Sequence, residues 1–204
     1  MPGINPVNRE TTAMDDEYRL RKDYFRSTYY GHSEKPESMH SGWASTNAQL
    51  GAYRYFLDFI NKDGTVMDLG CGNGRLLKFL CDSVASKLIP YGVDFLDESI
   101  LEARQAVLPA FAANFYVDNV YEFAQRDLGF TFLITNLVYV SRGHQQEFLK
   151  NCYESTEPGG RLLIYDYIES KDFDVFADSL SKLKRPCSKL VTSSNVTIAC
   201  YERA

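Results

Sequence analysis

The sequence predicts one α/β domain in which helices cover both faces of a doubly wound, mostly parallel sheet of seven strands. Three observations support this. Short apolar runs alternate with amphipathic helices over residues 65–168, a glycine-rich loop joins the first run to its helix, and two strand-like runs end the sequence. Regular alternation of strand and helix favours a parallel sheet, because each crossover helix returns the chain to the same edge.

Composition narrows the classes of protein. A chain of 204 residues with 45% hydrophobic residues suffices for one buried core. Its net charge of −5 disfavours a dedicated nucleic-acid binder, which usually carries a basic stripe. Without a signal pattern or an apolar stretch of about 20 residues, we expect a cytoplasmic protein, monomeric or homodimeric, that does not contact membranes. The five scattered cysteines predict reduced thiols and no metal site.

Residues 1–62 are expected to form an N-terminal helical extension, and residues 63–204 the main domain. Apolar spacing predicts one helix over residues 15–30, a loop over 31–42 and a second helix over 45–60. The first helix carries an aromatic stripe composed of Tyr18, Leu20, Tyr24, Phe25, Tyr29 and Tyr30. It also carries a basic group, for which we expect a solvated face, composed of Arg19, Arg21, Lys22 and Arg26.

The main domain begins with five apolar runs that predict strands. They cover residues 65–69, 88–93, 114–117, 130–135 and 161–168. Helices are predicted between them over residues 75–84, 98–107 and 144–156, the last closed by Pro158-Gly159-Gly160. A further helix over 173–183 precedes two runs, 189–192 and 196–200, which form an antiparallel hairpin because only three residues join them.

The strongest local signal is the loop at residues 68–74, Asp-Leu-Gly-Cys-Gly-Asn-Gly, between a buried strand and a helix. Glycine lets a ligand approach the main chain, and the start of a helix suits a carboxylate or phosphate. A phosphate-binding P-loop would need Gly-Lys-Ser/Thr, but Gly74 is followed by Arg75-Leu76. A dinucleotide fingerprint would need its third glycine at Arg75.

The stretch 66–74, an acid followed by three alternating glycines, closely resembles the first motif of class I S-adenosylmethionine-dependent methyltransferases. Residues 91–95 resemble the second strand of this family, which implies that Asp94 binds the ribose hydroxyls. Residues 114–120 resemble the third-strand motif, which implies that Asp118 or Asn119 contacts adenine. Asn136 stands where family members place a polar residue beside the methyl donor, and residues 157–164 resemble the Pro-Gly-Gly turn.

The resemblance covers residues 64–204 and implies a Rossmann-like methyltransferase fold with S-adenosyl-L-methionine as cofactor. The cofactor-binding residues that it implies are Asp68, Gly70, Cys71, Gly72, Asn73, Gly74, Asp94, Phe95, Asp118, Asn119, Val120 and Asn136. In this family an N-terminal segment often folds over the cofactor as a lid, so we expect the same of residues 1–62.

The acceptor is expected to be a small molecule, because Asn136 lacks the Pro-Pro-Tyr/Phe that would grip a base nitrogen. We expect Tyr30, Trp43, Tyr139 and Arg142 to bind it, from a wider set that includes Asp166, Tyr167 and Glu169. Positioning can suffice for methyl transfer, and His144 or Tyr139 would be the base if one is used. His144 is equally well placed as a helix cap, and Arg142 as a solvated residue.

Two other functions stay open. The basic helix suits an RNA or protein methyltransferase, and a cofactor pocket without turnover would make the chain a non-catalytic S-adenosylmethionine-binding protein.

Overall fold

The computed structural model describes residues 13–31, 46–124, 126, 129–167, 181, 183–193 and 196–204, without the side chains of residues 13–17, 46 and 139. The expected loop over 31–42, including Trp43 beside it, and the predicted helix over 173–183 lie almost wholly outside the described residues. The same is true of Glu169.

The predicted seven-stranded sheet is confirmed, with the strand order β3-β2-β1-β4-β5-β7-β6. Its strands are β1 Gly64–Leu69, β2 Leu88–Asp94, β3 Phe115–Val117, β4 Phe130–Asn136, β5 Thr156–Tyr167, β6 Lys189–Thr192 and β7 Val196–Glu202. The first five are parallel, and β7 pairs antiparallel with both β5 and β6, as expected for the terminal hairpin. Strands β2 and β3 are added on one side of β1, and β4 and β5 on the other, so the strand order switches between β1 and β4. Such a switch point forms a crevice at the carboxyl ends of the strands.

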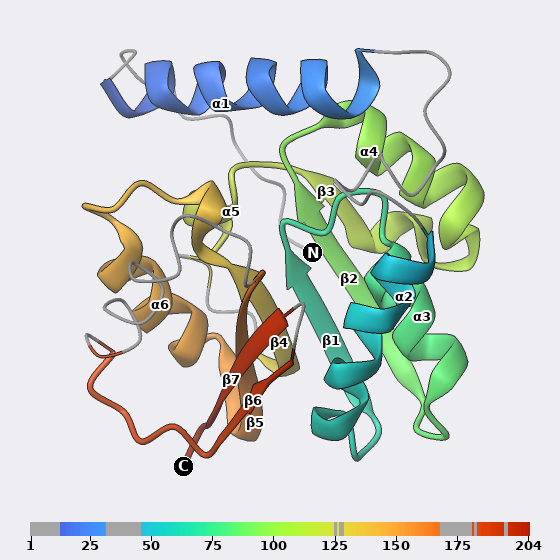
Figure 1. Cartoon of the computed structure of the whole chain (residues 1–204), viewed down its shortest axis with the longest axis vertical. Helices are drawn as coiled ribbons and strands as arrows, with labels where there is room; N and C mark the ends of the chain where they lie inside the picture. The colour runs from blue at the N-terminus through green and yellow to red at the C-terminus, as the bar shows by residue number, and fades with distance from the viewer. Residues whose placement is uncertain are drawn as a thin grey trace.

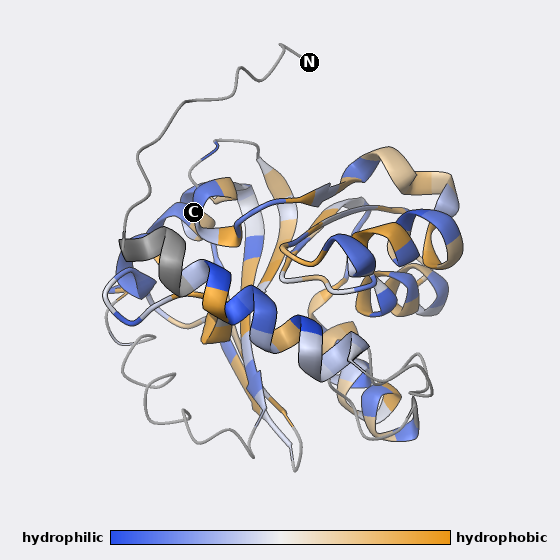
Figure 2. Cartoon of the chain, turned by 90° about the horizontal axis from the view of Figure 1, so that it is seen from above, coloured by the Kyte–Doolittle hydropathy of each residue, from blue (hydrophilic) through white to orange (hydrophobic). Residues whose placement is uncertain are grey.

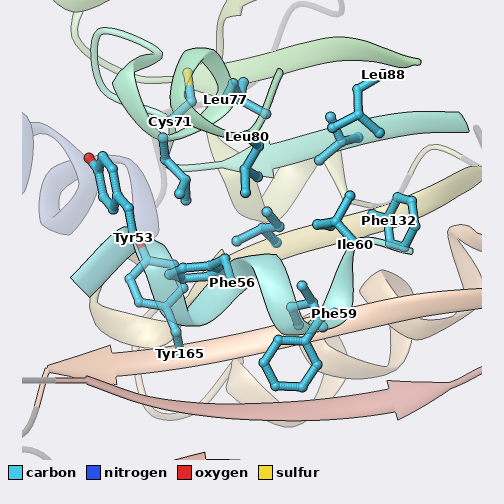
Figure 3. Close-up of a cluster of buried hydrophobic side chains, with 14 of the residues drawn as sticks. Tyr53, Phe56, Phe59, Ile60, Cys71, Leu77, Leu80, Leu88, Phe132 and Tyr165 are labelled. Carbon is cyan, nitrogen blue, oxygen red and sulfur yellow. The ribbon is translucent and has the colours of Figure 1, made fainter. Parts of the chain in front are cut away.

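Helices cover both faces of this sheet (Figure 1). One face packs against α2 Thr46–Tyr53, the 3-10 helix Arg54–Phe59, α3 Arg75–Ser83 and α4 Asp97–Glu102, and the other against α5 Val120–Phe123 and α6 Gln145–Glu154. Figure 3 shows the first core, in which Phe56 of the 3-10 helix packs against Tyr165 of β5, and Leu77 and Leu80 of α3 join the cluster. Alternate residues of each strand enter alternate cores, so Val66 faces α3 whereas Met67 faces α5 and α6.

Three predicted helices or turns differ in the structure. The helix over 45–60 becomes a 3-10 helix from Arg54 onward, and the helix over 98–107 ends in a π turn, Ala103–Val107. Pro158-Gly159-Gly160 does not close α6 but lies within β5, where the register against β4 shifts between Phe130 and Phe132. A Cβ on Gly160 would lie 3.0 Å from the carbonyl oxygens of Phe130 and Thr131, so glycine permits the strands to stay paired through this irregularity.

Helix α1, Ala13–Tyr30, lies across the edge of the sheet where the parallel strands end (Figures 1 and 2). Its residues Tyr18 and Phe25 pack against Phe95, just after β2, with ring centroids 5.9 and 5.7 Å apart. The expected aromatic stripe is only partly buried, because Leu20 and Tyr24 remain 69% and 65% exposed. Within the described ranges, no helix has the length and apolar character to cross a membrane. All five cysteines are free thiols.

Candidate functional site

The glycine loop after β1 adopts a backbone that only glycine takes readily. Gly70, Gly72 and Gly74 have φ values of 93°, 53° and 79°, all in the left-handed region. The N–H groups of Gly70 and Cys71 donate to Val93 O at 2.8 and 3.0 Å, which ties the loop to the end of β2. The loop therefore presents main chain without projecting side chains, next to the start of α3.

Asp94 ends β2 and joins that strand to the loop. Its Oδ2 accepts a hydrogen bond from Gly72 N and its Oδ1 one from Leu96 N, both at 2.9 Å. Burial raises the pKa of this carboxyl to about 6, although the two backbone donors oppose the increase. Each carboxylate oxygen can accept more than one hydrogen bond, so Asp94 retains acceptor capacity for two hydroxyl groups.

Asp68 lies near the end of β1 with only 2% of its surface exposed. Its Oδ1 has no hydrogen-bond partner among the described residues. Burial and then the nearby charge of Asp94 raise the pKa of Asp68 to about 8. A buried carboxylate without a partner is costly, and a cationic group beside it would offset that cost. The site therefore fits a ligand that carries positive charge, such as a sulfonium or an ammonium.

Asp118 and Asn119 close the turn between β3 and α5. Asp118 Oδ2 pairs with Arg126 Nη2 at 2.6 Å, and Asn119 Oδ1 caps α5 by accepting from Tyr121 N at 3.0 Å. Beside them an open pocket lies between α1 and the ends of β2 and β3. It is lined by Tyr18, Arg21, Phe25, Phe95, Asn119 and Val120.

Asn136 and His144 lie after β4. Asn136 Oδ1 accepts from Val138 N at 2.8 Å and so caps a short 3-10 helix, Leu137–Tyr139. His144 occupies the N-cap position of α6, as expected, but its side chain makes no capping hydrogen bond. Its ring lies 5.0 Å from that of Tyr121, on the α5 and α6 side of the sheet, whereas Asp68 points to the other face. Arg142 is exposed.

Tyr30 links α1 to the glycine loop. Its hydroxyl shares a hydrogen bond with Ser99 Oγ at 2.9 Å and donates to Glu102 Oε2 at 3.3 Å. Glu102 Oε1 in turn accepts from Asn73 Nδ2, a residue of the loop. Tyr30 is thus joined to the cofactor side of the crevice.

Four tyrosines, which we call the tyrosine cluster, gather on the face of the sheet that Asp68 shares: Tyr29, Tyr53, Tyr165 and Tyr167. The rings of Tyr165 and Tyr167 meet edge-on with centroids 5.5 Å apart, and Phe56 packs edge-on against Tyr165 (Figure 3). Burial raises the pKa of Tyr167 well above its ordinary value, and Tyr53, Asp68 and Tyr29 add to the increase. The cluster thus combines aromatic surface with several hydroxyl groups beside the end of β1.

The strands and the loop that form this crevice match a known protein family. Residues 66–160 match the family model described as a methyltransferase domain. This match agrees with the resemblance of the sequence to class I S-adenosylmethionine-dependent methyltransferases. The match begins within β1 and ends in β5, so it includes the glycine loop and the acids Asp68, Asp94 and Asp118. No curated protein sequence matches the chain.

Solved structures resemble the chain around this methyltransferase domain as well. The 1,6-didemethyltoxoflavin-N1-methyltransferase of Burkholderia thailandensis has a TM-score of 0.71 and 13% identity, over 98% of this chain and 94% of that one. The magnesium protoporphyrin IX methyltransferase of Synechocystis PCC 6803 has a TM-score of 0.67 and 18% identity, over 95% and 100%. An RNA methyltransferase of Salinibacter ruber reaches 0.54 and 14%, over 74% and 90%. All three share the fold.

The methyltransferase domain needs little acid–base machinery. The methyl carbon of S-adenosylmethionine is already electrophilic, so holding a nucleophile in line and excluding water can supply much of the catalysis. Glycine φ values, the acceptor capacity of Asp94 and the unpartnered oxygen of Asp68 all suit this cofactor.

Two residues at the crevice of the methyltransferase domain escaped the sequence-based prediction. Gln49 and Tyr165 are buried, and the sequence placed them only in a helix and a strand. Gln49 is a polar residue one turn before Tyr53 and two turns before Phe56, on the apolar stripe of α2. A buried polar residue on such a stripe is the signal that would have identified it.

Proposed function

We propose that this methyltransferase transfers the methyl group of S-adenosylmethionine to a small-molecule acceptor that binds beside the tyrosine cluster, in the cytoplasm. The observation that carries the proposal is the grouping of two buried tyrosines, Tyr53 and Tyr165, with the half-buried Tyr29 and Tyr167 near Asp68. Aromatic rings with polar tips suit a compact, partly apolar acceptor. Two similar structures support a small-molecule acceptor: one is a methyltransferase with bound 1,6-didemethyltoxoflavin, and the other is magnesium protoporphyrin IX methyltransferase.

The donor is proposed to lie along the glycine loop, with its ribose hydroxyls on Asp94. Its adenine would occupy the open pocket of Phe95, Asn119 and Val120, where Phe95 and Phe25 offer aromatic surface. Asp118 would hold the rim of that pocket through Arg126. This order places the sulfonium between Asp68 and the tyrosine cluster, so that an acceptor there faces the methyl group.

Helix α1 is proposed to act as the lid over this site, as part of the extension 1–62. Lys22 Nζ lies 2.8 Å from Asp97, and Arg26 lies 2.9 Å from Asp97 and 2.6 Å from Glu98. Arg21 donates to Val138 O at 2.5 Å. We call the contacts of Lys22 and Arg26 with α4 the latch. These basic side chains were expected to be solvated, but they bind this chain's own groups, which favours a lid over an RNA-binding surface.

The general base stays a proposal. His144 and Tyr139 remain candidates beyond β4, as do Arg142 and Asn136 for acceptor contacts. Tyr167 is a further candidate for orienting the acceptor, because it belongs to the tyrosine cluster and the charge of Asp68 acts on its hydroxyl.

The test has two stages. Calorimetric titration with S-adenosylmethionine and S-adenosylhomocysteine measures donor binding, and the absence of both would contradict the proposal. Formation of S-adenosylhomocysteine is then measured with panels of phenols, aromatic nitrogen heterocycles and carboxylic acids, and separately with tRNA and ribosomal RNA. Turnover confined to RNA, with an affinity that falls steeply with salt, would favour an RNA methyltransferase. Tight donor binding without turnover on any panel would favour a non-catalytic binder.

A further inference from the structure

Buried polar atoms without partners indicate where a ligand completes a site, because such atoms are rarely left unsatisfied in folded proteins. Among the described residues, three buried side-chain atoms have no hydrogen-bond partner: Gln49 Nε2, Asp68 Oδ1 and Glu98 Oε2. Glu98 already pairs with Arg26 in the latch. Gln49 and Asp68 remain, a donor and an acceptor at the same end of the sheet.

Gln49, a residue of α2, contacts the first residue of α3. It is fully buried on α2, and its Oε1 accepts a hydrogen bond from Arg75 Nε at 3.1 Å. Arg75 is the first residue of α3, directly after Gly74. One planar amide carries both Oε1 and Nε2, so the unpartnered N–H donors of Gln49 lie beside the same helix start. The first N–H groups and the dipole of α3, together with the Arg75 charge, make this position favourable for a carboxylate.

Asp68 lies at the other end of the glycine loop, where β1 leads into Gly70. The unpartnered carboxylate oxygen of Asp68 is a hydrogen-bond acceptor, whereas the unpartnered amide group of Gln49 is a donor. A group that carries an ammonium and a carboxylate on one carbon satisfies both. The amino-acid end of S-adenosylmethionine is such a group.

We infer that Gln49 binds the carboxylate of the methionine part of the donor, while Asp68 binds its ammonium. The inference rests on the proposed function, because it requires that the chain binds S-adenosylmethionine. It adds a donor-binding residue from outside the matched stretch 66–160. The N-terminal extension then serves the cofactor directly through α2 as well as covering it through α1.

The decisive experiment compares two ligands that differ only in the carboxylate, S-adenosylmethionine and decarboxylated S-adenosylmethionine. Their affinities are measured by calorimetry on the full chain, for the wild type and for Gln49→Leu. We expect Gln49→Leu to weaken S-adenosylmethionine about 10-fold or more, since a hydrogen bond to a charged group is lost. The decarboxylated ligand should change by less than about twofold.

Gln49→Glu sharpens the test, because it keeps the shape but opposes a carboxylate with a negative charge. It should weaken S-adenosylmethionine more than Gln49→Leu does, and leave the decarboxylated ligand unchanged or tighter. Gln146→Leu is the matched control, since Gln146 is an exposed glutamine on α6. Thermal unfolding of each unliganded variant shows whether it is folded.

Equal losses for both ligands in the Gln49 variants would overturn the inference, as would unchanged S-adenosylmethionine affinity. A wild type that binds the two ligands equally would overturn it too, while leaving the proposed function in place. A wild type that binds neither ligand, nor S-adenosylhomocysteine, would overturn the proposed function itself.

Discussion

The two walls of the crevice are built in different ways. The cofactor wall consists of the glycine loop after β1 and Asp94 at the end of β2, which are joined by hydrogen bonds from main-chain N–H groups of the loop to Asp94 Oδ2 and Val93 O. The acceptor wall, named for the ligand that we propose for it, consists of the tyrosine cluster, whose members come from α1, α2 and β5. The first wall presents main chain and acids at positions set by local turns. The second presents side chains that meet only after distant segments have packed.

This difference predicts that substitutions in the cofactor wall act on donor affinity through local geometry. Changes in the segments that cover the crevice should act more weakly on affinity and more through motion and charge. Five predictions follow, from the largest expected effect to the smallest.

Gly72→Val should weaken S-adenosylhomocysteine about 100-fold or more. Gly72 has a φ of 53°, which a β-branched residue adopts only at a cost, and its N–H holds Asp94. Calorimetric titration measures the loss. Gly51→Ala is the control, because no atom lies within 4 Å of a Cβ added there and alanine favours a helix. Affinity retained in Gly72→Val would show that the loop does not contact the donor.

Asp94→Ala should weaken S-adenosylhomocysteine about 10- to 100-fold, since it removes a charged acceptor for two hydroxyls and the partner of Gly72 N. The matched control is Asp82→Ala, because Asp82 is an exposed acid on α3 that pairs with Lys78 at 2.9 Å. Comparison with 2′-deoxyadenosine and adenosine as weak competitors isolates the ribose contact. A variant that distinguishes these two nucleosides as well as the wild type does would contradict the role of Asp94.

Donor affinity should fall as pH decreases from 8 to 6. Burial raises the pKa of Asp68 to about 8, and the ammonium of the donor requires its ionised form. Binding is therefore coupled to proton release, and affinity can fall up to about tenfold per pH unit below that pKa. Asp68→Asn should abolish this slope. A wild-type affinity that stays constant over this range would exclude the coupling.

The same residue should affect the stability of the unliganded protein with the opposite trend. The folded-state pKa of Asp68 lies above its unfolded value near 4, so its contribution to stability is complete below pH 4 and is lost as pH rises through 8. Asp68→Asn should therefore raise the free energy of unfolding above pH 8, by about 1–3 kcal/mol. Urea denaturation at pH 5 and pH 9 measures the change, and Asp82→Asn is the control.

Arg26→Ala should accelerate S-adenosylhomocysteine release by about two- to fivefold, because surface ion pairs contribute only about 0.2–1 kcal/mol. Arg26 joins the lid to Asp97 and Glu98 at 2.9 and 2.6 Å. Stopped-flow release rates at low and high salt measure the effect, which should shrink as salt screens the latch. Lys78→Ala, which breaks an ion pair within α3, should leave the rate unchanged. Equal rates for both variants would mean that the latch does not control release.

Much of the fold and of the cofactor wall was determined by the sequence alone. The spacing of apolar runs predicted all seven strands, and the glycines at 70, 72 and 74 predicted a loop that a ligand can approach. These features depend on interactions within a few residues or on the period of a strand, so the sequence is sufficient to predict them. The turn predicted at residues 158–160 was wrong, because the same residue types also suit the irregularity within β5 where its register against β4 shifts.

The grouping of residues in the acceptor wall and the burial of Gln49 could not be predicted from the sequence and become apparent only in the tertiary structure. In the sequence Tyr53 looks like an ordinary core residue of its helix, Tyr167 is one member of a wider set of candidates, and Gln49 looks like one polar residue in an apolar stripe. Their proximity results from packing α1 and α2 over the carboxyl ends of β1 and β5. The missing partners of Gln49 Nε2 and Asp68 Oδ1 likewise become apparent only when every neighbour is in place, because burial and hydrogen-bond satisfaction depend on the whole surrounding fold.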